Sequence, residues 1–357
     1  MLMSRTPFRI SFFGGGTDYP SWYKHHGGSV LATTINHYCY LTCRYLPPFF
    51  EHRFHVVYSR IENCSTIERI QHPAVRTTLK YLNLHQGLEI HHDCDLPARS
   101  GLGSSSAFTV GLLHALHALH GQHPSKAQLA QESLHIEQNL LGETVGSQDQ
   151  ICAAYGGFNH ITFGLNGEIS IQPVEVDGDR LHQLNRHLML FYTKVRRTAT
   201  ASEIARSYVP NLVKKQHQLG MLQALVDEGL KILVNHHDLN SFGELLHETW
   251  QLKRDLGAQI SNAQIDDLYR CARAAGAVGG KLTGAGGGGF LLLFVPPERQ
   301  ATVRDRLHNL IYVPFQFEGS GSQIMFSDRQ QPDTQTNQAI APSQTFVHAI
   351  PDRDSKD

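Results

Sequence analysis

The feature that most constrains the fold is a loop of glycines and serines between a strand pattern and a helix pattern. Apolar and polar residues alternate from Leu88 to Leu96, which is typical of a half-buried strand, and Pro97 ends this strand. Leucines then recur with helical spacing and predict a helix over Ala107–His120. A chain that passes from strand to glycine loop to helix folds, at this point, as a mixed α and β protein.

This Gly/Ser loop is predicted to hold phosphate. Its glycines let the backbone approach a ligand closely, the helix start presents N–H groups without partners, and the serine hydroxyls can bind phosphate or Mg²⁺. A serine-rich helix cap is the alternative interpretation. A Walker A loop is excluded because the loop lacks the pattern G-x-x-x-x-G-K-[ST]. The residues of the predicted cradle are Pro97, Gly101, Leu102, Gly103, Ser104, Ser105 and Ser106.

A second glycine run, Gly284–Gly289, formally satisfies the dinucleotide fingerprint G-x-G-x-x-G. The fingerprint of a Rossmann fold follows a strand and opens a helix. Here the run is expected to follow a helix and to open the strand Phe290–Val295. A nicotinamide dehydrogenase is therefore disfavoured, and we predict a close-packed loop that bears on the first glycine cradle.

A third glycine run follows the first predicted strand, Arg9–Phe13. Gly14–Gly16 can adopt backbone angles barred to other residues, so we expect this loop, which continues through Thr17 and Asp18, to press closely against another group.

The rest of the chain alternates between strand and helix periodicities and ends in a polar tail. Further strands are predicted over Val30–Tyr45, Arg53–Ser59, Asn159–Phe163, Ile169–Val174 and Leu188–Tyr192, and helices over Ser125–Leu141, Ala201–Leu256 and Ile265–Ala275. Beyond Phe326 the chain has few large apolar groups, and we expect disorder there.

Charge and composition exclude several classes of protein. The 31 Lys and Arg residues nearly cancel the 32 Asp and Glu residues, whereas a nucleic-acid-binding protein usually carries a basic excess. No apolar run approaches the ~18 residues of a membrane span, so we expect a cytoplasmic protein without membrane contact. The six cysteines form no CxxC pair, which speaks against a zinc knuckle.

The 23 histidines raise the question of a metal site. His114, His117 and His120 recur at helical spacing, but the leucine stripe of the same helix predicts that they face solvent. Two further groups are the adjacent pairs His25 with His26 and His91 with His92. No Cys, Asp or Glu completes a ligand set with them, so we expect solvated side chains rather than a metal centre.

Three segments resemble the motifs of one enzyme family. FRISFFGGGTDY (Phe8–Tyr19), PARSGLGSSSA (Pro97–Ala107) and KLTGAGGGGF (Lys281–Phe290) are similar, in order and spacing, to the motifs of the galactokinase, homoserine kinase, mevalonate kinase and phosphomevalonate kinase (GHMP) superfamily. FFGGGTDY together with GSQDQICAAYGGFNH (Gly146–His160) most resembles its branch of D-glycero-D-manno-heptose 7-phosphate kinases. The resemblance spans residues 5 to 325.

The resemblance implies roles for individual residues. Asp149 matches the catalytic aspartate, and Arg9 matches the basic residue that sits beside it and favours its ionised form. Ser105 and Glu137 match the Mg²⁺ ligands, and the loop serines match residues that bind the phosphates of ATP. The stretch TKVRR (Thr193–Arg197) differs from the family's usual sequence at this point but is expected to bind a substrate phosphate. The expected substrate contacts are Gly16, Thr17, Asp18, Arg196 and Arg197, and further ATP contacts are expected at Gly286 and Gly287.

The function implied by the resemblance is ATP-dependent phosphorylation of the anomeric hydroxyl of a heptose 7-phosphate, giving the 1,7-bisphosphate, with Mg²⁺ as cofactor. Another sugar 1-kinase, similar to galactokinase or fucokinase, and a non-catalytic sugar-sensing relative are the alternatives. The expected fold is α+β with two lobes: a β-rich N-terminal lobe over residues 1–185 and a C-terminal lobe with helices over a sheet at 186–327, before the tail at 328–357. The expected partners are a sugar phosphate and ATP, and the sequence does not distinguish a monomer from a homodimer.

Overall fold

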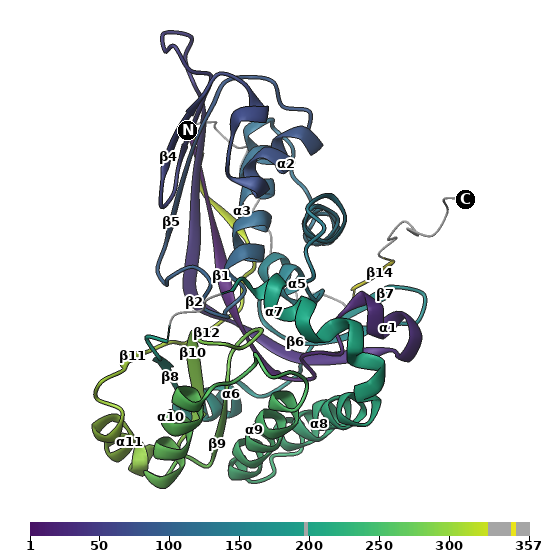
Figure 1. Ribbon diagram of the computed structural model, residues 1–357, viewed down its shortest axis with the longest axis vertical. Coiled ribbons are helices and arrows are strands. Elements are labelled where there is room, and N and C mark those ends of the chain that lie inside the picture. The colour runs from purple at the N-terminus through teal and green to yellow at the C-terminus, as the bar shows by residue number, and fades with distance from the viewer. Residues whose placement is uncertain (196–198, 328–343, 348–357) are drawn as a thin grey trace.

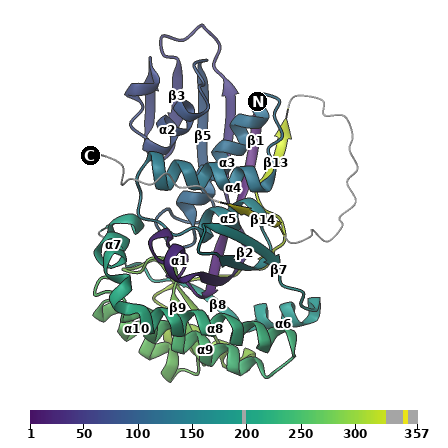
Figure 2. The same ribbon diagram turned by 90° about the vertical axis from the view of Figure 1, so that its right-hand side faces the viewer.

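The computed structural model describes residues 1–195, 199–327 and 344–347. Arg196, Arg197 and most of the polar tail, on which three of the predictions fall, lie outside the described residues. The chain forms two sheets with helices packed on them (Figures 1 and 2). This arrangement confirms the predicted α+β class with a β-rich N-terminal lobe and a C-terminal lobe of helices over a sheet. The boundary between residues 185 and 186 stays a prediction.

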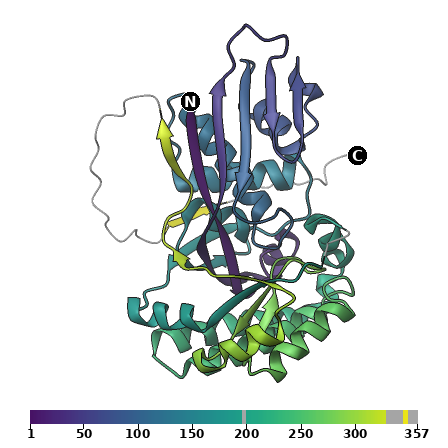
Figure 3. The same ribbon diagram turned by 90° about the vertical axis from the view of Figure 1, so that its left-hand side faces the viewer.

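The larger sheet is organised around its long second strand. The first half of β2 pairs with β6 and the second half with β5, while β1 runs antiparallel along the other edge of β2. Alternating burial in β3 and β5 leaves one face of this region open to solvent, and Figure 3 shows these strands in front of the helices that cover the other face. The strands are β1 (Leu2–Phe13), β2 (Gly28–Tyr45), β3 (Phe54–Val57), β4 (Ile61–Cys64), β5 (Leu88–Cys94), β6 (Phe158–Phe163), β7 (Glu168–Pro173), β12 (Phe317–Glu318), β13 (Gln323–Ser327) and β14 (Gln344–Val347).

The smaller sheet has the strand order β11-β8-β10-β9 and consists of β8 (Leu188–Tyr192), β9 (Gly279–Leu282), β10 (Phe290–Phe294) and β11 (Ile311–Val313). All five residues of β10 are buried, because this strand lies between two others and under helices. The helices are α1 (Pro20–His26), α2 (Pro73–Tyr81), α3 (Ser104–Leu119), α4 (Lys126–Leu134), α5 (Gln148–Tyr155), α6 (Gly178–His187), α7 (Ala201–Tyr208), α8 (Gln216–Val234), α9 (Leu239–Arg254), α10 (Ala263–Ala274) and α11 (Gln300–Arg306). Short helical turns lie at η1 (Ile67–Arg69), η3 (Val209–Lys215) and η4 (Pro297–Arg299), and η2 (His135–Leu140) is a π-helical segment.

Helix α3 is held very close to β1, and a glycine makes this approach possible. A Cβ atom on Gly111 would lie 2.8 Å from Oγ1 of Thr6, and the Ser4 hydroxyl donates a 2.9 Å hydrogen bond to the Gly111 carbonyl. The start of α3 is thereby fixed relative to the residues of β1 that follow Thr6.

The observed bounds of several helices and strands differ from the predicted ones. Helix α3 begins at Ser104 rather than Ala107, so the loop serines themselves form its first turn. The predicted helix from Ser125 is confirmed, with the Ser125 side chain accepting a hydrogen bond from the Gln128 amide, but it passes into the π-helical η2. The expectation that the second glycine run follows a helix directly is wrong, because β9 intervenes and the run joins two antiparallel strands.

The expectation that the α3 histidines face solvent is wrong for His117. Its side chain is 6% exposed and lies 2.6 Å from Glu132 of α4, so it bridges two helices. The leucine stripe did not predict this because nearly all of α3 is buried, including most of the side opposite the leucines. No helix within the described ranges has the length and apolarity needed to cross a bilayer.

Candidate active site

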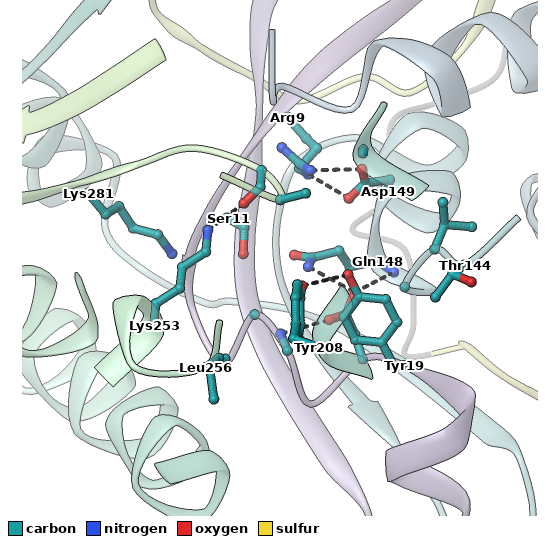
Figure 4. Close-up of a pocket in the computed structure, with 18 residues that line it drawn as sticks. Arg9, Ser11, Tyr19, Thr144, Gln148, Asp149, Tyr208, Lys253, Leu256 and Lys281 are labelled. Carbon is teal, nitrogen blue, oxygen red and sulfur yellow. Dashed lines mark hydrogen bonds and ion pairs between the residues drawn. The ribbon is translucent and has the colours of Figure 1, made fainter. Parts of the chain in front are cut away.

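An ion pair between β1 and α5 lies at the centre of the candidate site (Figure 4). Nε and Nη2 of Arg9 each lie 2.7 Å from one carboxylate oxygen of Asp149, which is the bidentate geometry that a guanidinium favours. Arg9 is 5% exposed, and its burial is the largest influence and opposes the charged form. The attraction and hydrogen bonds of Asp149, with smaller contributions from Cys152 and Asp18, together outweigh burial and raise the pKa of Arg9. The two residues assigned to catalysis from the sequence therefore meet in the fold.

The Gly/Ser loop lies directly against this pair. Nη1 of Arg9 donates a 2.8 Å hydrogen bond to the Gly101 carbonyl, and the Arg9 amide donates to the Leu102 carbonyl at 3.0 Å. Gly103, which precedes α3, has a φ of 77°, and a Cβ atom here would lie 3.1 Å from Cγ of Arg9 and 3.6 Å from Oδ2 of Asp149. The start of α3 and the Asp149 carboxylate are therefore neighbours, with no room for a side chain between them.

The three loop serines differ in their surroundings. Ser106 is buried and donates a 2.9 Å hydrogen bond to Oε2 of Glu137, whereas Ser105 is exposed at the first turn. Oγ of Ser104 accepts a hydrogen bond from the Arg99 amide at 3.3 Å. Because the first N–H groups of any α-helix lack acceptors within the helix, the first turn of α3 presents donors toward a ligand. Pro97, at the start of the loop, is exposed.

Glu137 is a buried carboxylate in the π-helical segment η2, and such segments often mark functional sites. It is 1% exposed, and Oε2 accepts a 2.5 Å hydrogen bond from the Gln150 side chain. Burial, followed by the nearby Glu143, raises the pKa of Glu137 to about 7 despite the opposing hydrogen bonds. Oε1 accepts no hydrogen bond of ordinary geometry among the described residues, although the Thr109 hydroxyl is near enough to lower the pKa of the carboxyl. A buried carboxylate oxygen of this kind, close to a serine hydroxyl, fits the hard oxygen ligands that Mg²⁺ prefers.

Asp18 lies at the other end of the site and is 2% exposed. Its Oδ1 accepts a 3.0 Å hydrogen bond from the Gly16 amide, and Oδ2 accepts a 2.9 Å bond from the side chain of Gln148. Burial is the main cause that raises the pKa of Asp18. Thr17 points away from the cavity, because its hydroxyl contacts the carbonyls of Gly14 and Ser29 and so fastens the loop to β2.

The cavity beside the ion pair also contains residues that the sequence analysis missed. Lys281 is buried and its Nζ donates to the Phe12 carbonyl at 2.8 Å, while Nζ of Lys253 donates to the carbonyls of Leu282 and Gly284. Burial, with Lys253 and Arg9 nearby, lowers the pKa of Lys281 well below its usual range. The added cavity residues include Ser11, Tyr19, Gln148, Tyr208, Lys253 and Lys281. Ser11, Tyr19, Gln148 and Lys281 lie within the family-like segments of the sequence. Tyr208 and Lys253 carried no such signal, and a lysine on an amphipathic helix such as Lys253 usually faces water.

The second glycine run packs backbone to backbone on the Gly/Ser loop. A Cβ atom on Gly284 would lie 2.4 Å from Cα of Gly101, and one on Gly289 would lie 2.2 Å from the Ser100 carbonyl oxygen. The predicted close-packed loop on the first cradle is therefore confirmed. Gly286 and Gly287 lie on the far side of this run, where the Gly287 amide donates to the Ile260 carbonyl at 2.9 Å. Ala285 and Gly284 line the cavity.

Comparison with protein families gives two matches that together span about half of the chain. The family model described as GHMP kinases N terminal domain matches residues 66–157, and the one described as GHMP kinases C terminal matches residues 223–312. The first match contains the Gly/Ser loop, Glu137 and Asp149, and the second contains Lys253 and the glycine run from Gly284.

Individual relatives and solved structures that resemble this chain include several sugar kinases. The D-glycero-alpha-D-manno-heptose 7-phosphate kinase of Campylobacter jejuni is 25% identical over 320 residues, which cover 84% of this chain and 91% of that protein. The galactokinase of Pyrococcus furiosus is 23% identical over 85% of this chain and 91% of its own length. A crystal structure of a D-glycero-D-manno-heptose 1-phosphate kinase from Bacteroides thetaiotaomicron superposes with a TM-score of 0.74 at 23% identity, covering 92% of this chain and all of that one.

Proposed function

The chain belongs to the GHMP kinase family, and from this premise we propose that it phosphorylates the anomeric hydroxyl of D-glycero-D-manno-heptose 7-phosphate. Family membership makes it an ATP-dependent phosphotransferase with an alcohol group as acceptor, and its relatives make it a sugar kinase. The choice of sugar and of the hydroxyl is the proposal.

One observation carries the proposed mechanism: the Arg9–Asp149 pair lies against Gly103, at the start of α3. The first turn of α3 binds the phosphates of ATP, and Asp149 accepts the proton of the sugar hydroxyl as its oxygen attacks the γ-phosphorus. The bond between that phosphorus and the bridging oxygen breaks, and ADP leaves with the electron pair. Arg9 holds the carboxylate in position by both oxygens, since phosphoryl transfer depends mainly on positioning and charge neutralisation.

Mg²⁺ would be held by Glu137 and a serine hydroxyl of the Gly/Ser loop. Oε1 of Glu137 accepts no hydrogen bond of ordinary geometry within the described chain, and Ser106 already contacts the other oxygen. Ser105, which matches the family's ligand by position, lies one residue earlier in the first turn of α3. When bound, the ion supplies positive charge that offsets the negative charge of the ATP phosphates.

The sugar would be recognised by Asp18 and its neighbours. Gln148 donates to Asp18, and both line the cavity. Oγ of Ser11 and Oε1 of Gln148 are buried without a hydrogen-bond partner among the described residues, and a buried polar atom of this kind is costly unless a ligand satisfies it. A polyhydroxylated acceptor would supply the missing hydrogen bonds.

A phosphate on the acceptor would find positive charge at Lys253 and Lys281, which line the same cavity. An anionic substrate would favour the charged form of Lys281, which burial disfavours in the free protein. Arg196 and Arg197 remain proposed contacts for the same phosphate. These cations favour a sugar phosphate over galactose or fucose. A non-catalytic sensor would have no need of both the Asp149 pair and the Glu137 carboxylate.

Purified protein should be assayed for ADP release with ATP, Mg²⁺ and a panel of sugars and sugar phosphates. The proposal expects the highest kcat/KM with the heptose 7-phosphate, and ³¹P NMR should then show a new anomeric phosphate. Turnover of free galactose or fucose in preference to every sugar phosphate would replace the proposal with another sugar 1-kinase. A product phosphorylated elsewhere than at the anomeric carbon would refute the assigned position.

A further inference from the structure

We propose that the solvent-facing side of the large sheet carries a site for a transition-metal ion such as Zn²⁺, formed by His55, Glu89 and His91. One possible ligand atom of each residue lies within 4.8 Å of those of the other two. The site lies on β3 and β5, in the part of the molecule away from helices α8 and α9 (Figures 1 and 3). It is separate from the candidate Mg²⁺ site at Glu137.

Strand register brings the three side chains together. β3 and β5 are parallel, and His55 pairs with Glu89. His91 follows Glu89 by two residues on β5, so its side chain lies on the same face of the sheet. The intervening Ile90 is buried under the helices on the opposite face. The position of the cluster is therefore set by the pairing of two strands and does not depend on the conformation of a loop.

Hydrogen bonds around the cluster leave the right atoms available to a metal. Both Nε and Nη2 of Arg44 contact Oε2 of Glu89, at 2.6 and 2.5 Å, so Oε1 is left on the side of His91. Oδ1 of Asn63 lies 2.5 Å from Nδ1 of His55 and can only accept, so Nδ1 carries the proton and Nε2 has a free lone pair. Metal-binding histidines almost always donate their second nitrogen in this way.

A bound ion would replace the hydrogen bond between His91 and Glu89. Nε2 of His91 now lies 2.7 Å from Oε1 of Glu89 and donates its proton there. The metal would take the place of that proton, which would move to Nδ1 of the same imidazole. Zn–N bonds of ~2.0–2.1 Å require ligand atoms ~3.3 Å apart, so small rotations of half-buried side chains would close the site. Water would fill the fourth position.

The donor set selects the kind of ion. Two imidazoles and one carboxylate suit Zn²⁺, Co²⁺, Ni²⁺ or Cu²⁺, whereas Mg²⁺ prefers oxygen ligands alone. Arg44 counts against binding, because its positive charge already neutralises Glu89. A surface ladder of ion pairs that holds no metal is therefore the competing interpretation, and binding of the metal itself decides between them.

Zn²⁺ titration by calorimetry and Co²⁺ absorption spectroscopy, on protein without a histidine tag, should test the site. We expect one tightly bound ion per chain, and d–d bands of a tetrahedral Co²⁺ complex. His55→Ala and His91→Ala should each weaken Zn²⁺ binding by more than ~10-fold, and Asn63→Ala by about 10-fold because the hydrogen bond that orients the His55 ring is lost. His182→Ala, at an exposed position on α6, is the matched control and should leave Zn²⁺ affinity unchanged.

Two results would overturn the proposal. The absence of a one-to-one Zn²⁺ complex would leave only the ion-pair ladder, and equal Zn²⁺ affinity in the His55→Ala, His91→Ala double variant would place the ion among other histidines. Should His91→Ala fail to fold, His91→Gln keeps a donor to Glu89 while removing the metal ligand. Kinase activity with Mg²⁺ should be the same in all of these variants, because the cluster is distant from Asp149.

Discussion

The side-chain amide of Gln150 donates a 2.5 Å hydrogen bond to Oε2 of Glu137. Gln150 directly follows Asp149 in the first turn of α5, so the candidate base and the candidate metal ligand are positioned by the same short helix. A movement of α5 would therefore shift Asp149 and Glu137 together. Substitutions at these two residues test the same arrangement of side chains.

Replacing the candidate base should slow turnover greatly without weakening nucleotide binding. In Asp149→Asn the amide keeps the shape of the side chain but cannot accept the proton of the sugar hydroxyl. We expect kcat to fall by ~10²–10⁴-fold, the usual range for general-base help, with little change in ATP affinity. ADP release gives kcat, and calorimetry gives ATP affinity. Asp227→Asn, at an exposed position on α8, should behave as the parent protein does. A near-parental kcat in Asp149→Asn would remove Asp149 from the mechanism.

Glu137 should make the metal-free protein less stable as the pH rises. Its pKa is about 7 in the folded chain, against 4.5 for an ordinary glutamate, so the folded state binds the proton more tightly than the unfolded state does. The stabilisation is complete below the unfolded pKa and is lost as the pH rises through 7. The pKa difference corresponds to roughly 3 kcal/mol of unfolding free energy.

Urea unfolding in a chelator, at about pH 5 and about pH 8, measures this contribution when the parent is compared with Glu137→Gln. The variant should lose this component of the pH dependence, because its amide does not titrate. Mg²⁺ should restore part of the parent's stability at the higher pH, since it binds the ionised carboxylate. Identical pH profiles for the two proteins would mean that Glu137 titrates normally in the fold.

Gly103 should tolerate no side chain. Its φ of 77° is strained for alanine, and the added methyl group would lie 3.1 Å from Cγ of Arg9. We expect Gly103→Ala to displace the ion pair from α3 and lower kcat/KM by ~10–100-fold. Gly178→Ala is the matched control, because nothing lies within 4 Å of its added Cβ and its φ is not in the left-handed region. Equal activity of the two variants would show that the contact between Gly103 and Arg9 does not matter for turnover.

The sequence predicted the parts of the site that carry strong local patterns. The strand, loop and helix around Ser104 follow from periodicity and glycine. The contact between the two glycine loops was predicted from their glycine content, although β9 was missed from the order of elements before the second loop. Lys253 was not found, because its burial depends on how α9 packs on β9. The sequence also could not show that Ser106 contacts Glu137, since side chains one residue apart on a helix point in directions about 100° apart.

Lys253 should select for an acceptor that carries phosphate. Its ammonium group lies at the cavity, bonded to the Leu282 and Gly284 carbonyls, and a charged hydrogen bond of ~1.5–3 kcal/mol to a phosphate would be worth ~10–100-fold in kcat/KM. Lys253→Met keeps the buried stem and removes the charge. The kcat/KM for a sugar phosphate should therefore fall by that factor, while any slow turnover of the corresponding free sugar changes little. A matched control is Lys231→Met on the exposed side of α8, where Nζ lies 2.7 Å from Glu228 in an exposed ion pair. If Lys253→Met instead raises the KM for ATP and affects both acceptors equally, the lysine acts on the nucleotide through the Gly284 loop, and the preference for a phosphorylated acceptor must come from other residues.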